Sequence, residues 1–356
     1  MSIGKRIALI FALALLLRGL VALGADSALE HLIQATVANT GLVEATVLSQ
    51  SSLLTAARED TGEEEVLYEF RYTGEEEDDL PHATPVPVPS EPPAPAEPLP
   101  ALTLTGTEGQ RTAAGIYVRN HTTYDIDVET LLAEPLSFDP ASGGQPTVLI
   151  LHTHGTESFQ PCADYWYDNA YNFRTLDSNL NITRIGREMT EIFEARGIRV
   201  LHNQDIFDYP SFRGSYGRSL MAAEQYLAAH PEIQIVFDIH RDAIMDSAGN
   251  YVRTMAEIEG TDSAQVMLVV GTDHAGLHHP YWQRNLQFAL RLQRAMVDLH
   301  PTFARPLALR EERFNAHLTP GSVLVEIGTC GNTLQEALTA SRLFAQLASD
   351  VILAGS

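Results

Sequence analysis

Residues 148–157 read Val-Leu-Ile-Leu-His-Thr-His-Gly-Thr-Glu, and this stretch decides the fold that the sequence predicts. Four consecutive apolar residues are typical of a central strand that is buried on both faces of a parallel sheet. Gly155 then permits a sharp turn where such a strand ends. In open α/β sheets, ligands bind outside the carboxyl ends of the strands. The two histidines and the glutamate at this strand end therefore form a candidate site.

Two further apolar runs have the same form. Residues 235–242 read Ile-Val-Phe-Asp-Ile-His-Arg-Asp, and residues 323–328 read Val-Leu-Val-Glu-Ile-Gly. Because the carboxyl ends of parallel strands meet at one edge of a sheet, we expect His240 and Glu326 to lie beside the first two histidines. Two imidazoles and a carboxylate are the ligand set of a catalytic zinc ion with an open fourth position. His154, Glu157 and His240 are thus the candidate metal ligands, and Glu326 is the candidate general base or acid.

The neighbours of these residues leave alternatives open. His152 competes with His154 as the ligand, because residues two apart on an extended chain point to the same face. Asp238 and Asp242 flank His240, and each either orients a metal-bound imidazole or simply caps a strand end. Arg313 precedes the turn before the Glu326 strand and is a candidate for binding a substrate carboxylate.

Three other features near the predicted site are weaker candidates. Residues 271–274 (Gly-Thr-Asp-His) end another predicted strand and are a weak candidate for contributing to the same edge of the sheet. Cys162 and Cys330 follow site strands, and in an exported protein they either pair or remain two unpaired small side chains. A cysteine hydrolase that uses Cys330 is an alternative chemistry, but it leaves the His-x-x-Glu motif unexplained.

The order of the predicted elements defines the fold class. Strands and helices alternate along the chain, which favours an α/β fold with a mostly parallel sheet and helices on both faces. Thr333 and Glu336 form a capping-box pattern at the start of the last helix. Strands are predicted at 115–120, 148–151, 199–202, 233–239, 266–270 and 323–327, and helices at 127–132, 180–195, 218–229, 281–299 and 334–353.

The N-terminal hundred residues differ from the rest in composition. Residues 1–25 begin with Lys5 and Arg6 before an apolar run, as in a signal or membrane anchor, and a retained anchor is favoured over cleavage. Residues 26–100 read as a juxtamembrane helix followed by an acidic, Pro-rich linker, since 81–100 hold nine of the nineteen prolines. We therefore expect a single N-terminal anchor in the cell membrane, with a catalytic domain at 101–356 outside the cytoplasm.

The charge of the chain argues against nucleic acid as a partner. The formal net charge is −23, whereas phosphate binding requires a basic surface. Residues 1–100 hold 5 Lys/Arg and 16 Asp/Glu, a net charge of −11, which leaves −12 for the longer remainder. The acidity is therefore concentrated in the predicted linker and indicates a solvated segment rather than a binding surface.

The site motifs resemble those of the stage II sporulation protein P family. The resemblance rests on residues 152–159, 238–243, 271–273 and 325–328, with Asn315 and residues 318–321, and it covers about 115–353. It implies a zinc-dependent peptidoglycan hydrolase with an N-acetylmuramoyl-L-alanine amidase-like fold. Such enzymes cleave the amide between N-acetylmuramic acid and L-alanine, and also stem-peptide cross-links, during engulfment in sporulation.

The resemblance also implies particular site residues and partners. The first motif supplies His152 or His154 together with Glu157, the second supplies His240, and the last supplies Glu326. The expected partners are peptidoglycan and, in a membrane complex, stage II sporulation proteins D and M. Two alternatives remain: a metallocarboxypeptidase-type enzyme acting on free peptides, and a catalytically inactive scaffold that binds the cell wall.

Overall fold

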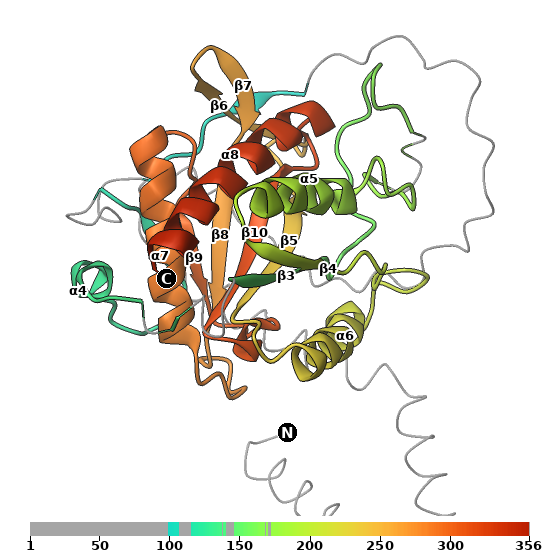
Figure 1. Ribbon diagram of the computed structural model, residues 1–356. Coiled ribbons are helices and arrows are strands. Elements are labelled where there is room, and N and C mark those ends of the chain that lie inside the picture. The colour runs from blue at the N-terminus through green and yellow to red at the C-terminus, as the bar shows by residue number, and fades with distance from the viewer. Residues whose placement is uncertain are drawn as a thin grey trace, which may run out of the picture. The chain divides into compact units, whose positions relative to one another are not determined.

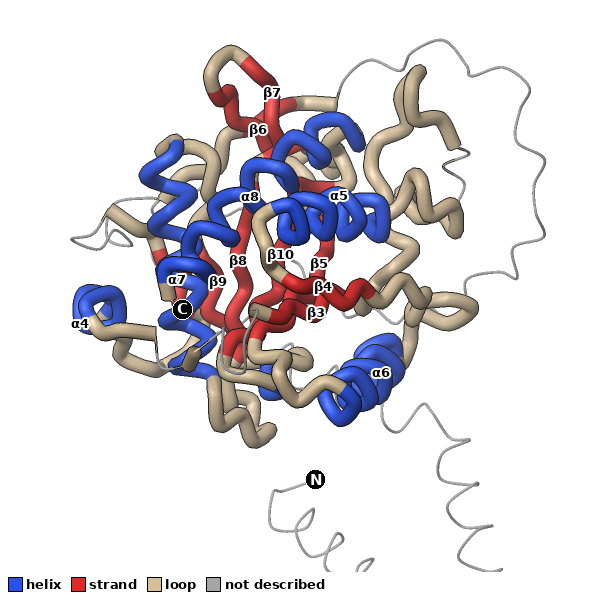
Figure 2. The backbone as a smooth tube through the Cα atoms, viewed as in Figure 1, coloured by secondary structure: helices blue, strands red, loops and turns tan. Residues whose placement is uncertain are grey.

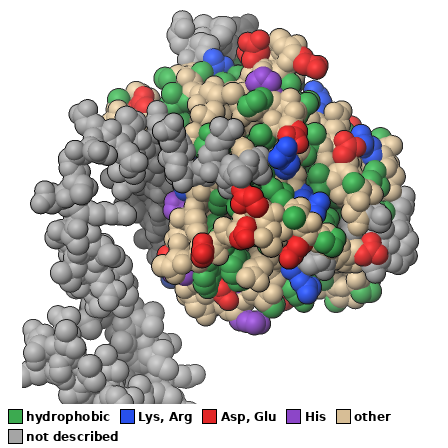
Figure 3. Space-filling model, turned by 90° about the vertical axis from the view of Figure 1, so that its left-hand side faces the viewer, with side chains coloured by type: hydrophobic (Ala, Val, Ile, Leu, Met, Phe, Trp, Pro, Cys, Tyr) green, Lys and Arg blue, Asp and Glu red, His purple; other side chains and the backbone are tan. Residues whose placement is uncertain are grey.

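The computed structural model describes residues 99–106, 115–136, 138–139, 146–167, 169 and 172–355. The predicted targeting segment at 1–25 and almost all of the predicted linker at 26–100 lie outside these residues. Figure 3 shows acidic and basic side chains interspersed among apolar ones over the described part of one face. On that face, charge is not gathered into a single patch.

A seven-stranded sheet forms the centre of the described domain, in the order β2-β9-β8-β10-β5-β3-β4 (Figure 1). Within it, five of the six strand pairings are parallel, and the pairing of β8 with β10 is antiparallel. The predicted mostly parallel α/β sheet is confirmed. The strands are β2 (Val118–Asn120), β3 (Thr147–Leu151), β4 (Arg199–His202), β5 (Ile235–Asp242), β8 (Val266–Gly271), β9 (Leu307–Arg310) and β10 (Gly321–Thr329).

Helices cover the two faces of this sheet unequally (Figures 1 and 2). One face, which we call the covered face, packs against α5 (Ile182–Ala195), α7 (Trp282–Leu299) and α8 (Leu334–Ala354) in one large apolar core. The opposite face, the site face, meets α6 (Ser215–Ala229), which packs on Leu149, Leu151 and Val236 of β3 and β5. The prediction of helices on both faces is confirmed. The strands contribute to the covered face Val148, Ile150, Val200, Ile235, Phe237, Ile239, Val266, Leu268, Val270, Leu307, Leu309, Val323, Val325 and Ile327.

Local sequence signals explain where the helices begin. The Thr333 side chain accepts a hydrogen bond from the Glu336 backbone N–H, and the Glu336 carboxylate accepts one from the Thr333 N–H, so the predicted capping box is present. The Asn181 side chain caps α5 by accepting a hydrogen bond from the Thr183 N–H, without a reciprocal bond. Among the described residues, α8 alone is long and apolar enough to cross a membrane, but half of its apolar window is buried inside the domain. We therefore interpret α8 as a core helix.

Several elements were not predicted from the sequence. A small sheet joins β1 (Ala101–Leu102) to the hairpin of β6 (Arg253–Ile258) and β7 (Thr261–Ala264). The backbone N–H of Arg253 donates to the Pro100 carbonyl at 3.0 Å, and its Nε donates to the Leu99 carbonyl at 3.1 Å. The end of the predicted linker is thus docked on the domain. The short strand β9 was also missed, whereas helix α4 (Val128–Ala133), capped by Asp127, was predicted.

The direction of β8 corrects one prediction about the site. Because β8 runs antiparallel to β10, its carboxyl end lies at the edge of the sheet opposite to His240 and Glu326. Residues 271–274 therefore do not join the site, and the prediction that they do is wrong. There the Asp273 carboxylate accepts a hydrogen bond from the Tyr124 hydroxyl at 2.8 Å, and His274 Nε2 lies 3.0 Å from the Thr123 hydroxyl.

Candidate functional site

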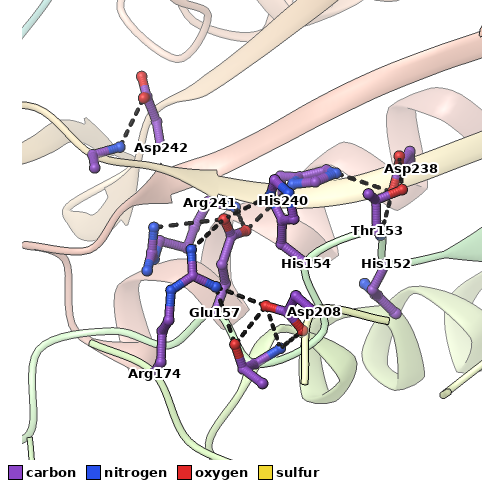
Figure 4. A network of polar contacts seen from close by, with 12 residues as sticks. His152, Thr153, His154, Glu157, Arg174, Asp208, Asp238, His240, Arg241 and Asp242 are labelled. Atoms are coloured by element: carbon purple, nitrogen blue, oxygen red, sulfur yellow. Dashed lines mark hydrogen bonds and ion pairs between the residues drawn. The ribbon is translucent and has the colours of Figure 1, made fainter. Parts of the chain in front are cut away.

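A buried cluster of three side chains lies where β3 and β5 end (Figure 4). His154, Glu157 and His240 each offer one ligand atom, and these atoms all lie within 4.8 Å of one another. His154 Nδ1 lies 3.3 Å from Glu157 Oε1, and His240 Nδ1 lies 3.4 Å from Glu157 Oε2. The structure thus brings together the three residues that the sequence predicted as metal ligands.

The turn after β3 selects His154 over His152. The strand ends at Leu151, and residues 153–156 form a turn that removes His154 from the alternation of the strand. Gly155 allows the chain to pass close to residues 205 and 206, because a Cβ atom there would lie 2.8 Å from Ile206 Cδ1 and 3.3 Å from Ile206 Cα. The turn carries the His154 ring beside that of His240, with 4.8 Å between the ring centroids.

His152 instead points toward the covered face. Its Nδ1–H donates to the Ile239 carbonyl at 3.0 Å, so its unprotonated Nε2 accepts a hydrogen bond from His202 Nε2 at 2.9 Å. A Cβ atom at Gly186 of α5 would lie only 2.5 Å from each of these two Nε2 atoms. Burial lowers the pKa of His152 to about 4 and that of His202 to about 3, so both rings are neutral at pH 7.

The donor set fits a divalent cation with nitrogen and oxygen ligands. Atoms bound to one zinc ion at ~2.0–2.2 Å in tetrahedral geometry lie about 3.3–3.6 Å from one another. The two nitrogen–oxygen distances of 3.3 and 3.4 Å in the cluster match this spacing. The three residues therefore suit a zinc-type site.

Asp238 orients one of these imidazoles. Its Oδ1 lies 3.0 Å from His240 Nε2, on the opposite side of the ring from Glu157. The Asp238 carboxylate also accepts hydrogen bonds from the Thr153 N–H at 2.9 Å and the Thr153 hydroxyl at 2.7 Å. Burial lowers the pKa of His240, but Asp238 and then Glu157 outweigh it and raise that pKa well above its usual value. The contact supports the orienting role predicted for Asp238.

Arg241 and the two histidines hold Glu157 in its ionised form. The Arg241 backbone N–H donates to Glu157 Oε2 at 3.1 Å, and the Arg241 and Arg174 guanidinium groups lie 3.7 and 3.8 Å from Oε1. Burial raises the pKa of Glu157, but Arg241 and the two histidines outweigh it and lower that pKa well below its usual value. Arg174 is itself fixed by Asp208 at 2.7 Å. Arg174 and Asp208 were not predicted, because each lies in a loop with no motif around it.

Glu326 lies next to the cluster on the site face. Parallel pairing places it in register with His240, and both side chains line one cavity of about 230 Å³. Burial and the nearby Asp242 raise the pKa of Glu326 to about 8. Its Oε2 has no hydrogen-bond partner among the described residues. Asp242 is ion-paired at 2.8 Å with Arg305, whose side chain is fully buried.

The remaining predicted residues lie apart from the cluster. Arg313 donates from Nη1 to the His278 carbonyl at 3.1 Å and is not among the residues that line the cavity. Cys162 and Cys330 are both free thiols. Burial raises the pKa of Cys330 to about 11, which disfavours the thiolate that a cysteine nucleophile requires.

Fold and site together define the class of this protein as an α/β domain with a buried His-Glu-His cluster of the metal-ligating type. Comparison with known families identifies it further. The family model described as "Stage II sporulation protein P (SpoIIP)" matches residues 90–349, and the chain belongs to this family. The chain is also similar to "Stage II sporulation protein P" of Bacillus subtilis (strain 168), with 27% identity over 241 residues. That match covers 64% of this chain and 57% of the relative, so it spans little more than half of the relative's length.

Two solved structures share weaker similarity with the chain. One is N-acetylmuramoyl-L-alanine amidase AmiC2 of Nostoc punctiforme, with 13% identity, a TM-score of 0.34, and coverage of 58% of this chain and 94% of that one. The other is the CwlD amidase from Clostridioides difficile in complex with the GerS lipoprotein, with 12% identity and a TM-score of 0.36. It is matched over 59% of this chain and 97% of its own length.

Proposed function

We propose that the chain is a zinc-dependent peptidoglycan hydrolase that cleaves the amide between N-acetylmuramic acid and L-alanine during engulfment in sporulation. One observation carries the proposal: in a stage II sporulation protein P family member, His154, Glu157 and His240 form a buried cluster that shares a cavity with Glu326. Two imidazoles and one carboxylate can hold a catalytic zinc ion, and a second carboxylate can move protons in metal-assisted amide hydrolysis.

The side chains divide the chemistry among them. His154, Glu157 and His240 would hold zinc, which when bound polarises the scissile carbonyl and lowers the pKa of water toward ~7. Glu326 takes the proton of the attacking water and returns it to the leaving amine. Burial and Asp242 raise the pKa of Glu326 to about 8, so this carboxylate binds a proton more tightly than an exposed one does. Asp238 keeps His240 in one orientation, and Arg241 keeps Glu157 ionised.

The proposal extends to the setting of the reaction. We place the catalytic domain outside the cytoplasm on a single N-terminal membrane anchor at residues 1–25, because that segment has the pattern of a targeting sequence. Cleavage of stem-peptide cross-links would be a further activity of the same site. Stage II sporulation proteins D and M would be its partners in a membrane complex.

Mass spectrometry of the products from purified peptidoglycan tests the reaction. The full chain is incubated with peptidoglycan in detergent, with and without a zinc chelator, and the bound metal is measured in parallel. We expect released stem peptides with an intact N-terminal L-alanine and at least tenfold less product with the chelator. His240→Ala should lose both metal and product, whereas His274→Ala, at the opposite edge of the sheet, should keep both.

Other outcomes would overturn the proposal in distinct ways. Peptides shortened only from their carboxyl ends would indicate a carboxypeptidase-type enzyme. Product formation that is unaffected by the chelator and by His240→Ala would exclude the metal cluster as the catalytic site. A metal-loaded chain that binds peptidoglycan and releases nothing, even with its proposed partners added, would indicate a scaffold.

A further inference from the structure

The cavity at the metal cluster continues along the site face beyond Glu326, and its character changes there. Near the cluster the lining holds all the carboxylates and histidines of the cavity together with Phe212 and Tyr216, which lie beside His154. The continuation is lined by apolar side chains and by one arginine, Arg310 of β9. We propose that this continuation binds the peptide that leaves the scissile amide and that Arg310 pairs with a carboxylate of that peptide. This inference rests on the proposed function. The apolar lining consists of Met267, Val269, Ala308, Phe314 and Leu324.

Strand register gives the direction and the length of the continuation. Glu326 is paired with Met267, and Arg310 is paired with Gly271 at the other end of β8. Arg310 therefore lies two strands from Glu326, about 10 Å across the sheet, and four residues away, about 13 Å along it. The arginine side chain shortens this path. At ~3.5 Å per residue, the carboxylate belongs to the second or third residue after the scissile amide.

The guanidinium group of Arg310 is available for such a contact. Its hydrogen bonds to other described side chains go to Glu312, from Nε at 3.2 Å and from Nη2 at 3.4 Å, and both are long. The Glu312 side chain is itself 49% exposed, whereas that of Arg310 is 16% exposed. Since a guanidinium carries five N–H donors, Nη1 is left to meet a ligand in the cavity.

Charge along the cavity favours an acidic, weakly apolar ligand. The carboxylates among its lining residues are Glu157, Asp242 and Glu326, and all three lie at the cluster end. The other end combines an apolar wall with the Arg310 guanidinium group, whose ion-pair partner, Glu312, lies outside the lining. A stem peptide has the matching chemistry, because it carries alanine methyl groups and free carboxylates. An arginine–carboxylate pair in a half-enclosed site is also stronger and more selective than one at an open surface.

Paired substrates test the role of Arg310. Muropeptides whose second or third residue carries a free carboxylate are compared with the same muropeptides amidated at residue two, at residue three, or at both. For the wild-type chain we expect KM to rise about 10- to 100-fold on amidation of the recognised residue, with kcat changed less than threefold. The KM of Arg310→Gln should equal, on free and amidated substrates alike, the KM that the wild-type chain shows on the amidated one. Arg310→Lys should retain part of the difference between the two substrates. Arg294→Gln, which removes an exposed arginine paired with Asp298 on α7, is the matched control.

A binding measurement separates this inference from the proposed function. Calorimetry of the free stem tripeptide, acidic or amidated, with the full chain needs no hydrolysis. Carboxylate-dependent binding that Arg310→Gln abolishes would support the peptide site even if no peptidoglycan is cleaved. Hydrolysis by the wild-type chain with equal KM for free and amidated substrates would overturn the role of Arg310 and leave the hydrolase intact. The role of Arg310 would also be overturned if Arg310→Gln raised KM by the same factor for the free and the amidated substrate. A thermal unfolding midpoint within 3 °C of wild type would establish that each variant is folded.

Discussion

The covered face and the site face of the central sheet use the same strands for opposite purposes. In β10, Val325 and Ile327 point into the apolar core. Leu324 and Glu326, which alternate with them along the strand, line the cavity. In β5, Phe237 and Ile239 alternate in the same way with Asp238 and His240. Because side chains alternate along a strand, a single run of residues both builds the core and carries the chemistry.

The two faces also differ in what burial costs. On the covered face, each fully buried Val, Ile or Phe side chain stabilises the fold by ~1.5–3 kcal/mol. On the site face, buried carboxylates cost several kcal/mol each unless charges or hydrogen bonds compensate them. Glu157 has Arg241 and Arg174 as partners, and Asp242 has Arg305, whereas Glu326 Oε2 has no hydrogen-bond partner among the described residues. Apolar burial on the covered face therefore offsets the free-energy cost of burying charged groups on the site face.

Adjacent residues of β10 give the largest contrast between the faces. Glu326→Gln should lower the rate of amide hydrolysis about 10²- to 10⁴-fold, because the amide cannot take up the proton of the attacking water. Its free energy of unfolding should not fall, since the substitution removes a buried ionisable group that lacks a partner for one oxygen. Ile327→Ala should instead cost ~2–5 kcal/mol of stability, because it opens a cavity in the core.

Kinetics of peptide release and urea unfolding of both variants check this contrast. The molecules that remain folded in the Ile327→Ala sample should bind metal and hydrolyse substrate at nearly the wild-type rate. A Glu326→Gln variant that is active, or that is destabilised as strongly as Ile327→Ala, would show that the two faces are not separated in this way.

Within the site face, the contact between Asp238 and His240 predicts a smaller effect. Asp238→Asn keeps the shape of the side chain but removes the charge that lies 3.0 Å from His240 Nε2. We expect zinc affinity to fall about 10- to 100-fold, as is usual when a carboxylate behind a ligating histidine is lost. Competition with a chromophoric chelator measures this affinity. Asp262→Asn on the exposed part of β7 is the control, and equal affinities for the two variants would remove Asp238 from the metal site.

Much of this arrangement could be predicted from sequence because buried strands and strand-end motifs are local patterns. The runs ending at His240 and Glu326 are apolar and β-branched, and parallel strands bring their ends to one edge. The direction of β8 could not be predicted in the same way. An apolar run such as Val266–Gly271 reads alike in parallel and antiparallel pairing, and the intervening β6–β7 hairpin, which permits the reversal, had no strong signal.

The choice between His152 and His154 required the structure for a similar reason. Alternation predicts one face for both residues as long as the chain is extended, and the strand ends before either of them. Arg174 and Arg305, which pair with carboxylates of the site, were missed because neither lies in a motif and only the fold brings them there. Arg313 was chosen instead because it lies near the Glu326 strand in sequence, whereas β9 brings Arg310 into the cavity by its pairing with β8.

A pair of helical glycines tests the assignment of His152 to the covered face, with the smallest expected effect. Gly186→Ala in α5 places a methyl group 2.5 Å from the Nε2 atoms of His152 and His202, so one ring must move and their hydrogen bond is lost. We expect a loss of ~1–3 kcal/mol in the free energy of unfolding, as is usual for overpacking. Gly217→Ala in α6 meets no atom within 4 Å and should instead stabilise the chain by ~0.5–1 kcal/mol through helix propensity.

The zinc affinities of the two glycine variants test whether His152 is a metal ligand. If His152 belongs to the covered face, the folded fraction of Gly186→Ala should bind zinc as tightly as Gly217→Ala, because the ring that moves is not a ligand. A loss of affinity confined to Gly186→Ala would return His152 to the metal site and would show that the turn at 153–156 does not separate the two histidines. Urea unfolding and chelator competition on the same samples distinguish these outcomes. Unfolding measures the loss of stability that the clash causes, and competition measures the zinc affinity of the His154, Glu157 and His240 cluster.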